Sequence, residues 1–337
     1  MHAEGAQILL EILLLCGAAY WLAYVNGAND NSKGVATLIG SGTLSVRDAI
    51  RWGTLSTLMG SITAIALSHG LITAFSGKGL LPDSVLATPA FLISVGIGSA
   101  GTIFIATRTG FPISTTHALV GGLAGVGLAA GQLNIDRLLQ SFLIPLLVSP
   151  LLAALGASAL HTLFRGLGKF SGITLDTCLC ISREMTPLGA TRLRVTQAET
   201  FTSEEVLQEN SFSIASPVLE ISPSEQCAPP LPQGAFGIHL QRVSDNAHLI
   251  SAGAVSFARG LNDTPKIAAL LLSAQLLEIP AWISLLTVGV FMAVGGMISS
   301  RAVAHTMSHE ITTMDKGEGL AGNFVTAALV LGASKFG

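Results

Sequence analysis

Residues 27–33 read Gly-Ala-Asn-Asp-Asn-Ser-Lys, and residues 260–266 read Gly-Leu-Asn-Asp-Thr-Pro-Lys. Glycine, asparagine, aspartate and lysine recur in register, and both copies lie within apolar sequence. An ionised carboxylate in such surroundings is costly unless it meets a counter-charge, a cation or water. A chain that carries this cost twice, at matching places in its two halves, is typical of a transport site built from a duplicated membrane unit.

The composition indicates a membrane protein. Half of the 337 residues are hydrophobic, 11% are charged, and the mean hydropathy is +0.64. Uncharged runs occupy residues 12–29, 52–77, 84–107, 109–135, 138–160 and 279–300, and several reach the ~20 residues that a helix needs to cross a bilayer. We therefore expect an all-α, multi-pass integral membrane protein in contact with the lipid bilayer. No basic patch suggests nucleic acid as a partner.

Two apolar halves flank a polar segment. Residues 165–245 hold six of the 17 basic and nine of the 20 acidic residues and contain no long apolar run. We expect a first transmembrane repeat over residues 1–164, a hydrophilic loop over 165–245 with a small domain around 190–208, and a second, incomplete repeat over 246–337. The basic residues of the loop favour a cytoplasmic location, although a long loop contributes less to orientation than a short one.

The apolar pattern also predicts helices that are interrupted near the duplicated element. Residues 249–259 and 265–277 are each too short to span a bilayer alone, and together they indicate one helix broken at 261–265, where Pro265 lacks a backbone donor. The first half matches, with a helix over 7–26 and a short piece over 34–39. Further helices are expected over residues 49–75, 85–107, 114–130, 138–164, 281–300 and 321–334. The expected architecture is thus two inverted repeats of transmembrane helices with broken or re-entrant segments.

At three motifs the sequence resembles the inorganic phosphate transporter (PiT) family. Residues 27–30 (Gly-Ala-Asn-Asp) and 260–263 (Gly-Leu-Asn-Asp) match the signature that this family carries in each half, with leucine for alanine in the second copy. Residues 112–117, Pro-Ile-Ser-Thr-Thr-His, match a further family element. The plan of two hydrophobic halves around a variable hydrophilic loop is also similar. The resemblance implies a sodium- or proton-coupled phosphate symporter of the cell (inner) membrane.

The chain departs from the family pattern in two respects. The family has a second Ser-Thr-Thr-His element late in its second half, and residues 333–337 align with residues 106–110, which lie just before the first copy. The chain thus ends where the second copy is expected to begin, which indicates either a fragment or a short variant that completes its site differently. The second departure is the pair of lysines, Lys33 and Lys266.

The twin elements supply oxygen ligands for a cation. Asn29, Asp30, Asn262 and Asp263 offer carboxylate and amide oxygens beside the expected helix breaks, where backbone carbonyls would also be free. We expect these four residues to bind the coupling cation, with Asp30 and Asp263 as ligands of sodium. The alternative is that each aspartate caps a short helix, which is a common place for this residue.

The Pro-Ile-Ser-Thr-Thr-His element is suited to an anion. Gly110 and Pro112 indicate a turn, and Ser114 is a suitable N-cap for the apolar helix that follows. A helix N-terminus offers free backbone N–H groups and the positive end of a dipole, and Ser114, Thr115 and Thr116 add hydroxyl donors. We expect these three residues to contact phosphate, as the resemblance also implies. Alternatively, the hydroxyls bond to carbonyls within their own helix.

His117 follows Ser114 by three residues and lies on the same helical face. It is a candidate to donate to the anion or to relay a proton. A histidine that only packs and hydrogen-bonds is equally consistent with the sequence.

Lys33 and Lys266 each follow their aspartate by three residues, so each can reach it. We consider three roles for them: cations that bind phosphate, internal counter-charges that replace a bound cation, or lysines that extend from a helix end to the membrane surface. If the lysines neutralise the aspartates, dependence on sodium weakens and proton coupling becomes more favourable.

The sequence as a whole predicts a secondary active transporter that carries inorganic phosphate by symport with sodium or a proton. We expect no cofactor and no catalytic residues, and a homodimer is compatible with the sequence. A transporter of another oxyanion such as sulfate would use the same architecture. A membrane-embedded phosphatase or pyrophosphatase is a weaker alternative, because metal-ion catalysis needs clustered carboxylates and the matched ones number one in each half.

Overall fold

The computed structural model describes residues 2–67, 69–86, 88–171, 177–187, 213–223, 236–274, 279–311 and 315–336. Its contacts divide the chain into two compact units, one formed by residues 1–167 with 245–337 and the other by residues 168–244. The first unit is helical, and the second contains a small sheet.

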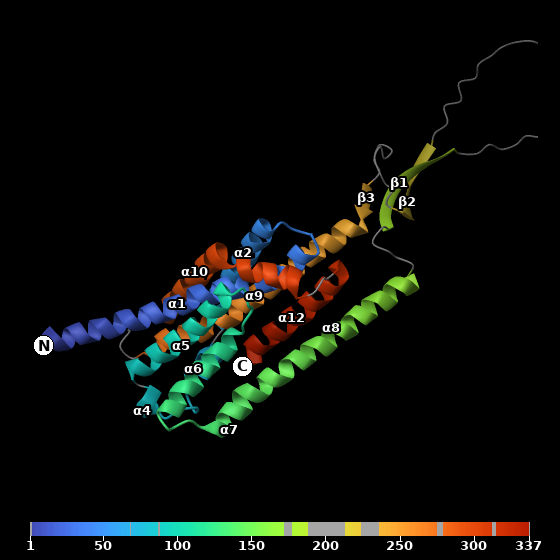
Figure 1. The fold of residues 1–337 in the computed structure, drawn as a ribbon. Helices are drawn as coiled ribbons and strands as arrows, with labels where there is room; N and C mark the ends of the chain where they lie inside the picture. The colour runs from blue at the N-terminus through green and yellow to red at the C-terminus, as the bar shows by residue number, and fades with distance from the viewer. Residues whose placement is uncertain are drawn as a thin grey trace, which may run out of the picture. The chain divides into compact units, whose positions relative to one another are not determined.

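Twelve α-helices are described, and strands β1, β2 and β3 lie between α8 and α9 in the chain (Figure 1). The helices are α1 (His2–Gly40), α2 (Val46–Leu67), α3 (His69–Phe75), α4 (Asp83–Leu86), α5 (Pro89–Arg108), α6 (Thr115–Ala129), α7 (Ile135–Leu138), α8 (Ile144–Ser171), α9 (Leu240–Leu272), α10 (Ala281–Ser299), α11 (Arg301–His305) and α12 (Lys316–Phe336). Two π-helical turns, η1 (Leu139–Leu143) and η3 (Thr306–Glu310), continue α7 and α11.

The helical unit has the properties of a membrane protein. Among the described residues, four segments are long and apolar enough to cross a bilayer, at Glu4–Gly40, Pro89–Arg108, Ile135–Leu167 and Ala281–Ser299. The third segment buries none of its apolar window against the rest of the unit, so α8 exposes a continuous hydrocarbon surface. Such a surface is stable in lipid and unfavourable in water. The expectation of a helical membrane protein is confirmed.

The predicted interruption of the two signature helices was wrong. α1 and α9 each continue through their Asn-Asp element without a break. Pro265 lies inside α9, where it removes one intrahelical hydrogen bond but does not end the helix. The tertiary context overrides the local signal, because α9 packs closely against α2 at Gly260 and Gly60, just before this proline.

Helices α1 and α10 cross at two glycines. A Cβ on Gly27 of α1 would overlap the backbone carbonyl oxygen of Met292, and a Cβ on Gly295 of α10 would overlap that of Tyr24. Each helix therefore presents a glycine to the backbone of the other, and the two axes approach more closely than side chains would allow. Small residues at helix contacts are the usual means of close packing within membranes.

Helices α9 and α2 cross in the same way. A Cβ on Gly260 would overlap the carbonyl oxygen of Thr57, and a Cβ on Gly60 would overlap that of Phe257. The α9 residues of this crossing lie 233 positions after their α1 counterparts, and its α2 residues lie 235 positions before their α10 counterparts. The structure thus contains one helix crossing twice, and each copy pairs one helix from the first half with one from the second.

The second unit contains a three-stranded antiparallel sheet in the order β2-β1-β3. Strand β1 (Thr177–Pro187) pairs along its length with β2 (Ser213–Pro223), and its first part pairs with β3 (Phe236–His239). The sequence reading treated this segment as a loop and did not anticipate these strands. The small domain expected around residues 190–208 lies outside the described residues.

Candidate functional site

Asp30 lies within α1, ten residues before the helix ends, and is buried beside positive charges. Its Oδ1 contacts Nζ of Lys33, one helical turn later on the same face, and its Oδ2 accepts a hydrogen bond of 3.1 Å from Nη1 of Arg259 on α9. An Asp side chain within a helix, 6% exposed, is tolerated here because both of its oxygens meet a cation. The alternative role of Asp30 as a helix cap was wrong, because the helix continues on both sides of it.

Asp263 occupies the equivalent position in α9. Lys266 Nζ lies 3.2 Å from Asp263 Oδ1 and donates a hydrogen bond of 2.8 Å to the Thr116 hydroxyl. The ammonium also lies over the ring of Phe75, 5.3 Å from its centroid. Asp263 is interior to α9, so it does not cap a helix either, and the carboxylates of Asp263 and Asp30 are close enough to interact.

The start of α6 contacts both lysines. Gly110 has a φ of +79°, a conformation that favours glycine, and there the chain leaves α5 and turns toward α6. Ser114 forms the expected N-cap, since its hydroxyl accepts a hydrogen bond of 3.3 Å from the His117 backbone N–H. Lys33 Nζ contacts the Ile113 carbonyl, one residue before the cap. Segments from α1, α9 and the α6 N-terminus therefore meet at one buried place.

The three hydroxyl residues of α6 occupy different environments. Thr115 is buried and its hydroxyl donates to Asn26 Oδ1, whereas Thr116 is half-buried and bonds to Lys266. Ser114 is exposed. The side chains of Thr115 and Thr116 thus bond across to α1 and α9, and the alternative in which they bond to carbonyls of their own helix does not describe them.

The remaining predicted residues lie around this cluster. Asn29 fastens the approach to α6, because its Nδ2 donates to Thr107 Oγ1 and the Phe111 carbonyl and its Oδ1 accepts from the Ile113 N–H, each at 3.0 Å. Asn262 is half-buried, and its Nδ2 is 3.5 Å from Asp263 Oδ1. The hydrogen bonds of the cluster given above do not include the His117 ring, which belongs to an exposed residue.

Two residues of the cluster were missed in the sequence reading. Asn26 and Arg259 lie 233 positions apart, each one residue before its Gly-x-Asn-Asp element. Within the described part of the chain, Asn26 Nδ2 and Arg259 Nε are buried donors without a hydrogen-bond partner. The sequence did contain a signal for this pair: Arg259 is a charged residue within an apolar half, and it lies in register with the polar Asn26 of the other half.

The charges of the cluster do not balance. Among the described residues, Lys33, Lys266 and Arg259 form ion pairs with Asp30 and Asp263, so these five groups carry one excess positive charge when all are ionised. The positive end of the α6 dipole adds to this excess. A buried excess of positive charge with unused N–H donors is an environment suited to an anion.

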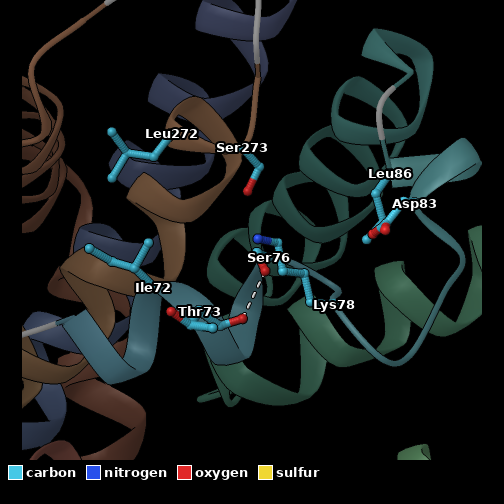
Figure 2. A pocket seen from close by; sticks show the side chains of 8 residues that line it. All are labelled: Ile72, Thr73, Ser76, Lys78, Asp83, Leu86, Leu272 and Ser273. Atoms are coloured by element: carbon cyan, nitrogen blue, oxygen red, sulfur yellow. Dashed lines mark hydrogen bonds between the residues drawn. The ribbon is translucent and has the colours of Figure 1, made fainter.

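A cavity lies elsewhere in the helical unit. It has a volume of about 550 Å³ and opens between α3, the turn that follows it, α4 and the end of α9, as Figure 2 shows. Its lining consists of Ile72, Thr73, Ser76, Lys78, Asp83, Leu86, Leu272 and Ser273. None of these residues belongs to the charged cluster. The candidate site is placed at the cluster because its ion pairs and unpartnered donors are suited to bind an anion.

Similar proteins are described as phosphate permeases or phosphate transporters. A Pyrococcus furiosus protein provisionally named a phosphate permease is 26% identical over 365 residues, covering 98% of this chain and 84% of that protein. A sodium-dependent phosphate transporter of Plasmodium falciparum is 30% identical over 168 residues, covering 48% of this chain and 24% of that protein. A solved structure described as the sodium-dependent phosphate transporter has the same fold, with a TM-score of 0.68 and 19% identity over 97% of this chain and 84% of that one.

A family-level match covers most of the chain. The sequence pattern of the Phosphate transporter family extends over residues 26–337, which include both Asn-Asp elements and the α6 segment between them. The apolar helices make the chain an integral membrane protein. On this evidence the chain belongs to the Phosphate transporter family.

Proposed function

We propose that the chain is a secondary active transporter that moves inorganic phosphate across a membrane by symport with a cation. The observation that carries this proposal is the cluster of three cations and two carboxylates near the N-terminus of α6, of which Arg259 is half-buried and the other four lie inside the unit. Phosphate is a compact dianion or monoanion with several acceptor oxygens, so it matches an excess of positive charge surrounded by N–H and O–H donors. The names of the relatives support the same substrate.

Phosphate would be held from three sides. The α6 N-terminus supplies backbone N–H groups and the hydroxyls of Ser114, Thr115 and Thr116. Lys33 and Lys266 supply ammonium groups from α1 and α9. The free donors of Asn26 and Arg259 add two further contacts at matching positions, so that the anion would be bound by both halves of the molecule.

The carboxylates form the cation side of the same site. Asp30 and Asp263, with the amides of Asn29 and Asn262 nearby, are proposed to bind the coupling cation. Phosphate and a cation would bind together, because each reduces the desolvation cost of the other in a low-dielectric interior. The ammonium groups already in contact with both carboxylates bear on the identity of that cation.

The duplicated crossing supports transport by alternating access. Helix pairs α1/α10 and α9/α2 repeat one packing arrangement with constant sequence offsets, as expected for two inverted repeats in a multi-pass protein. The charged cluster lies on α1 and α9, the two helices that correspond to each other. Movement of one repeat against the other would expose this cluster to each side of the cell (inner) membrane in turn.

Removal of the Thr116 hydroxyl provides a test. Thr116→Val keeps the size of the side chain but removes the hydroxyl that accepts a hydrogen bond from Lys266 and that would donate to phosphate. We expect the KM for phosphate to rise roughly tenfold, since a hydrogen bond to a charged group contributes ~1.5–3 kcal/mol. Initial rates of radiolabelled phosphate uptake into proteoliposomes give the KM. Thr102→Val on α5 is the matched control, because its hydroxyl is exposed and bonds only within its own helix. Equal KM values for both variants would contradict the assignment of Thr116.

The same assay separates the rival substrates. Unlabelled phosphate should compete with labelled phosphate, while a tenfold excess of sulfate should leave the rate unchanged. Competition by sulfate would instead identify a transporter of broader oxyanion range. Release of phosphate from pyrophosphate by the purified protein would support the enzymatic alternative.

A further inference from the structure

The surroundings of the Lys33 ammonium are those of a bound hard cation. Its Nζ contacts a carboxylate oxygen of Asp30 and the carbonyl oxygen of Ile113, which lies in the non-helical stretch before α6. Carboxylates together with carbonyls of irregular backbone are the ligands that Na⁺ finds at midplane sites of transporters. Here the ammonium occupies that set of oxygens.

Lys266 repeats this arrangement in the second half. Its Nζ is held by the Asp263 carboxylate at 3.2 Å and the Thr116 hydroxyl oxygen at 2.8 Å. The oxygen partners of the two lysines, apart from the aspartates, both come from residues 113–116. Two matching lysines on different helices therefore deliver their charges to one short segment.

Both lysines are buried, which excludes the third role considered for them. The side chains of Lys33 and Lys266 are 9% and 5% exposed. A lysine that extends to the membrane surface keeps its ammonium in water, whereas these two ammonium groups are directed to aspartates inside the unit. Their charges are therefore part of the site.

A third positive group strengthens the argument. Arg259 Nη1 occupies the other oxygen of Asp30, so both oxygens of that carboxylate are already paired with cations. A sodium ion at Asp30 would have to displace one of these groups or lie beside two like charges. Both courses are unfavourable in a buried site.

We propose that Lys33 and Lys266 act as tethered cations in place of coupling sodium ions, so that this chain binds and carries phosphate without Na⁺ and the cation of the proposed symport is not sodium. The inference rests on the proposed function for the identity of the anion, but its claim about sodium stands on the lysine contacts. It also separates this chain from the relative in Plasmodium falciparum, whose name describes it as sodium-dependent.

The first experiment measures labelled phosphate uptake into proteoliposomes containing the full chain, with external Na⁺ replaced by N-methylglucamine at constant pH and ionic strength. We expect the initial rates with and without Na⁺ to agree within twofold. A loss of tenfold or more on removal of Na⁺ would overturn the proposal. Absence of uptake in both media would refute the proposed function, and the second experiment then tests the lysines alone.

The second experiment measures binding of radioactive Na⁺ to the purified protein without phosphate. The wild-type protein should bind no radioactive Na⁺ above background. Lys33→Met or Lys266→Met should gain binding, because an aspartate loses its tethered cation. Lys33→Arg, which keeps the charge, should not gain it.

Lys316→Met is the matched control for these variants. Lys316 forms an ion pair of 2.6 Å with Asp245 outside the cluster, so its removal should not create a sodium site in the cluster. Binding of Na⁺ to the wild-type protein at a level that the methionine variants do not raise would overturn the proposal. Two separate lysine variants are included so that a failure of one to fold does not decide the result.

Discussion

Replacement of Asp30 or Asp263 by asparagine should abolish phosphate uptake while the protein still enters the membrane. Asp30→Asn leaves Lys33 and Arg259 without their shared counter-charge, and Asp263→Asn does the same to Lys266. Loss of one partner of a buried ion pair typically costs about 3–5 kcal/mol. The excess charge of the cluster would also double, so that phosphate, once bound, would be released too slowly for turnover. We expect uptake to fall roughly a hundredfold or more, in line with this cost.

The control for this prediction is an aspartate of the same unit outside the cluster. Asp48 forms an exposed ion pair with Arg51 at 3.4 Å, and exposed pairs contribute only about 0–1 kcal/mol. Asp48→Asn should therefore retain uptake within twofold of the wild-type protein. Membrane insertion of all three variants is checked by extraction with detergent and gel filtration. Near-normal uptake by both cluster variants would remove the carboxylates from the transport site.

Gly27→Ala should destabilise the helical unit strongly, although the change adds a single methyl group. Alanine normally stabilises a helix by ~1 kcal/mol relative to glycine. At residue 27, however, the new Cβ would overlap the Met292 carbonyl oxygen, so α1 and α10 must move apart. Overpacking of this kind costs about 1–3 kcal/mol, which corresponds to a fall of roughly 3–10 °C in melting temperature. Gly260→Ala, at the second crossing, should behave alike.

Gly17→Ala is the matched control on the same helix. A Cβ at Gly17 would meet nothing within 4 Å, so only the gain in helix propensity applies there. Thermal melting in detergent, followed by gel filtration, should place this variant at or slightly above the wild-type protein. A melting temperature for Gly27→Ala equal to that of Gly17→Ala would mean that the crossing is less tight than described.

Much of the fold could be predicted because hydrophobic length is a strong signal. The apolar runs placed α5 and α10 within a few residues of their observed bounds. The sequence failed at residues 261–265, where proline and polar residues indicated a break. Local propensity favours interruption there, but the contact between α9 and α2 outweighs it, and such a contact between distant segments is not visible in a window of sequence. The sheet of the polar segment was missed for a similar reason.

The candidate site could be predicted in part. The repeat in register identified Asp30 and Asp263, and the turn before α6 identified Ser114 as a cap. The pairing of Arg259 with Asp30 could not be anticipated, because the two residues lie on different helices and 229 positions apart. Likewise, the amide of Asn29 can bind a cation through its oxygen or form hydrogen bonds through both its oxygen and its nitrogen. Only the fold shows that it hydrogen-bonds to the segment before α6.

The twin glycine crossings impose an order on biosynthesis. Each crossing joins a helix made early to one made late, α1 to α10 and α2 to α9, and the polar segment with its sheet lies between them in the chain. Neither half can complete its close helix contact from its own residues. Helices α1 and α2 are therefore synthesised before α9 and α10, and the contacts at Gly27 and Gly60 can form only after these later helices have been made. Membrane insertion and final folding are thus separate events in time for this protein.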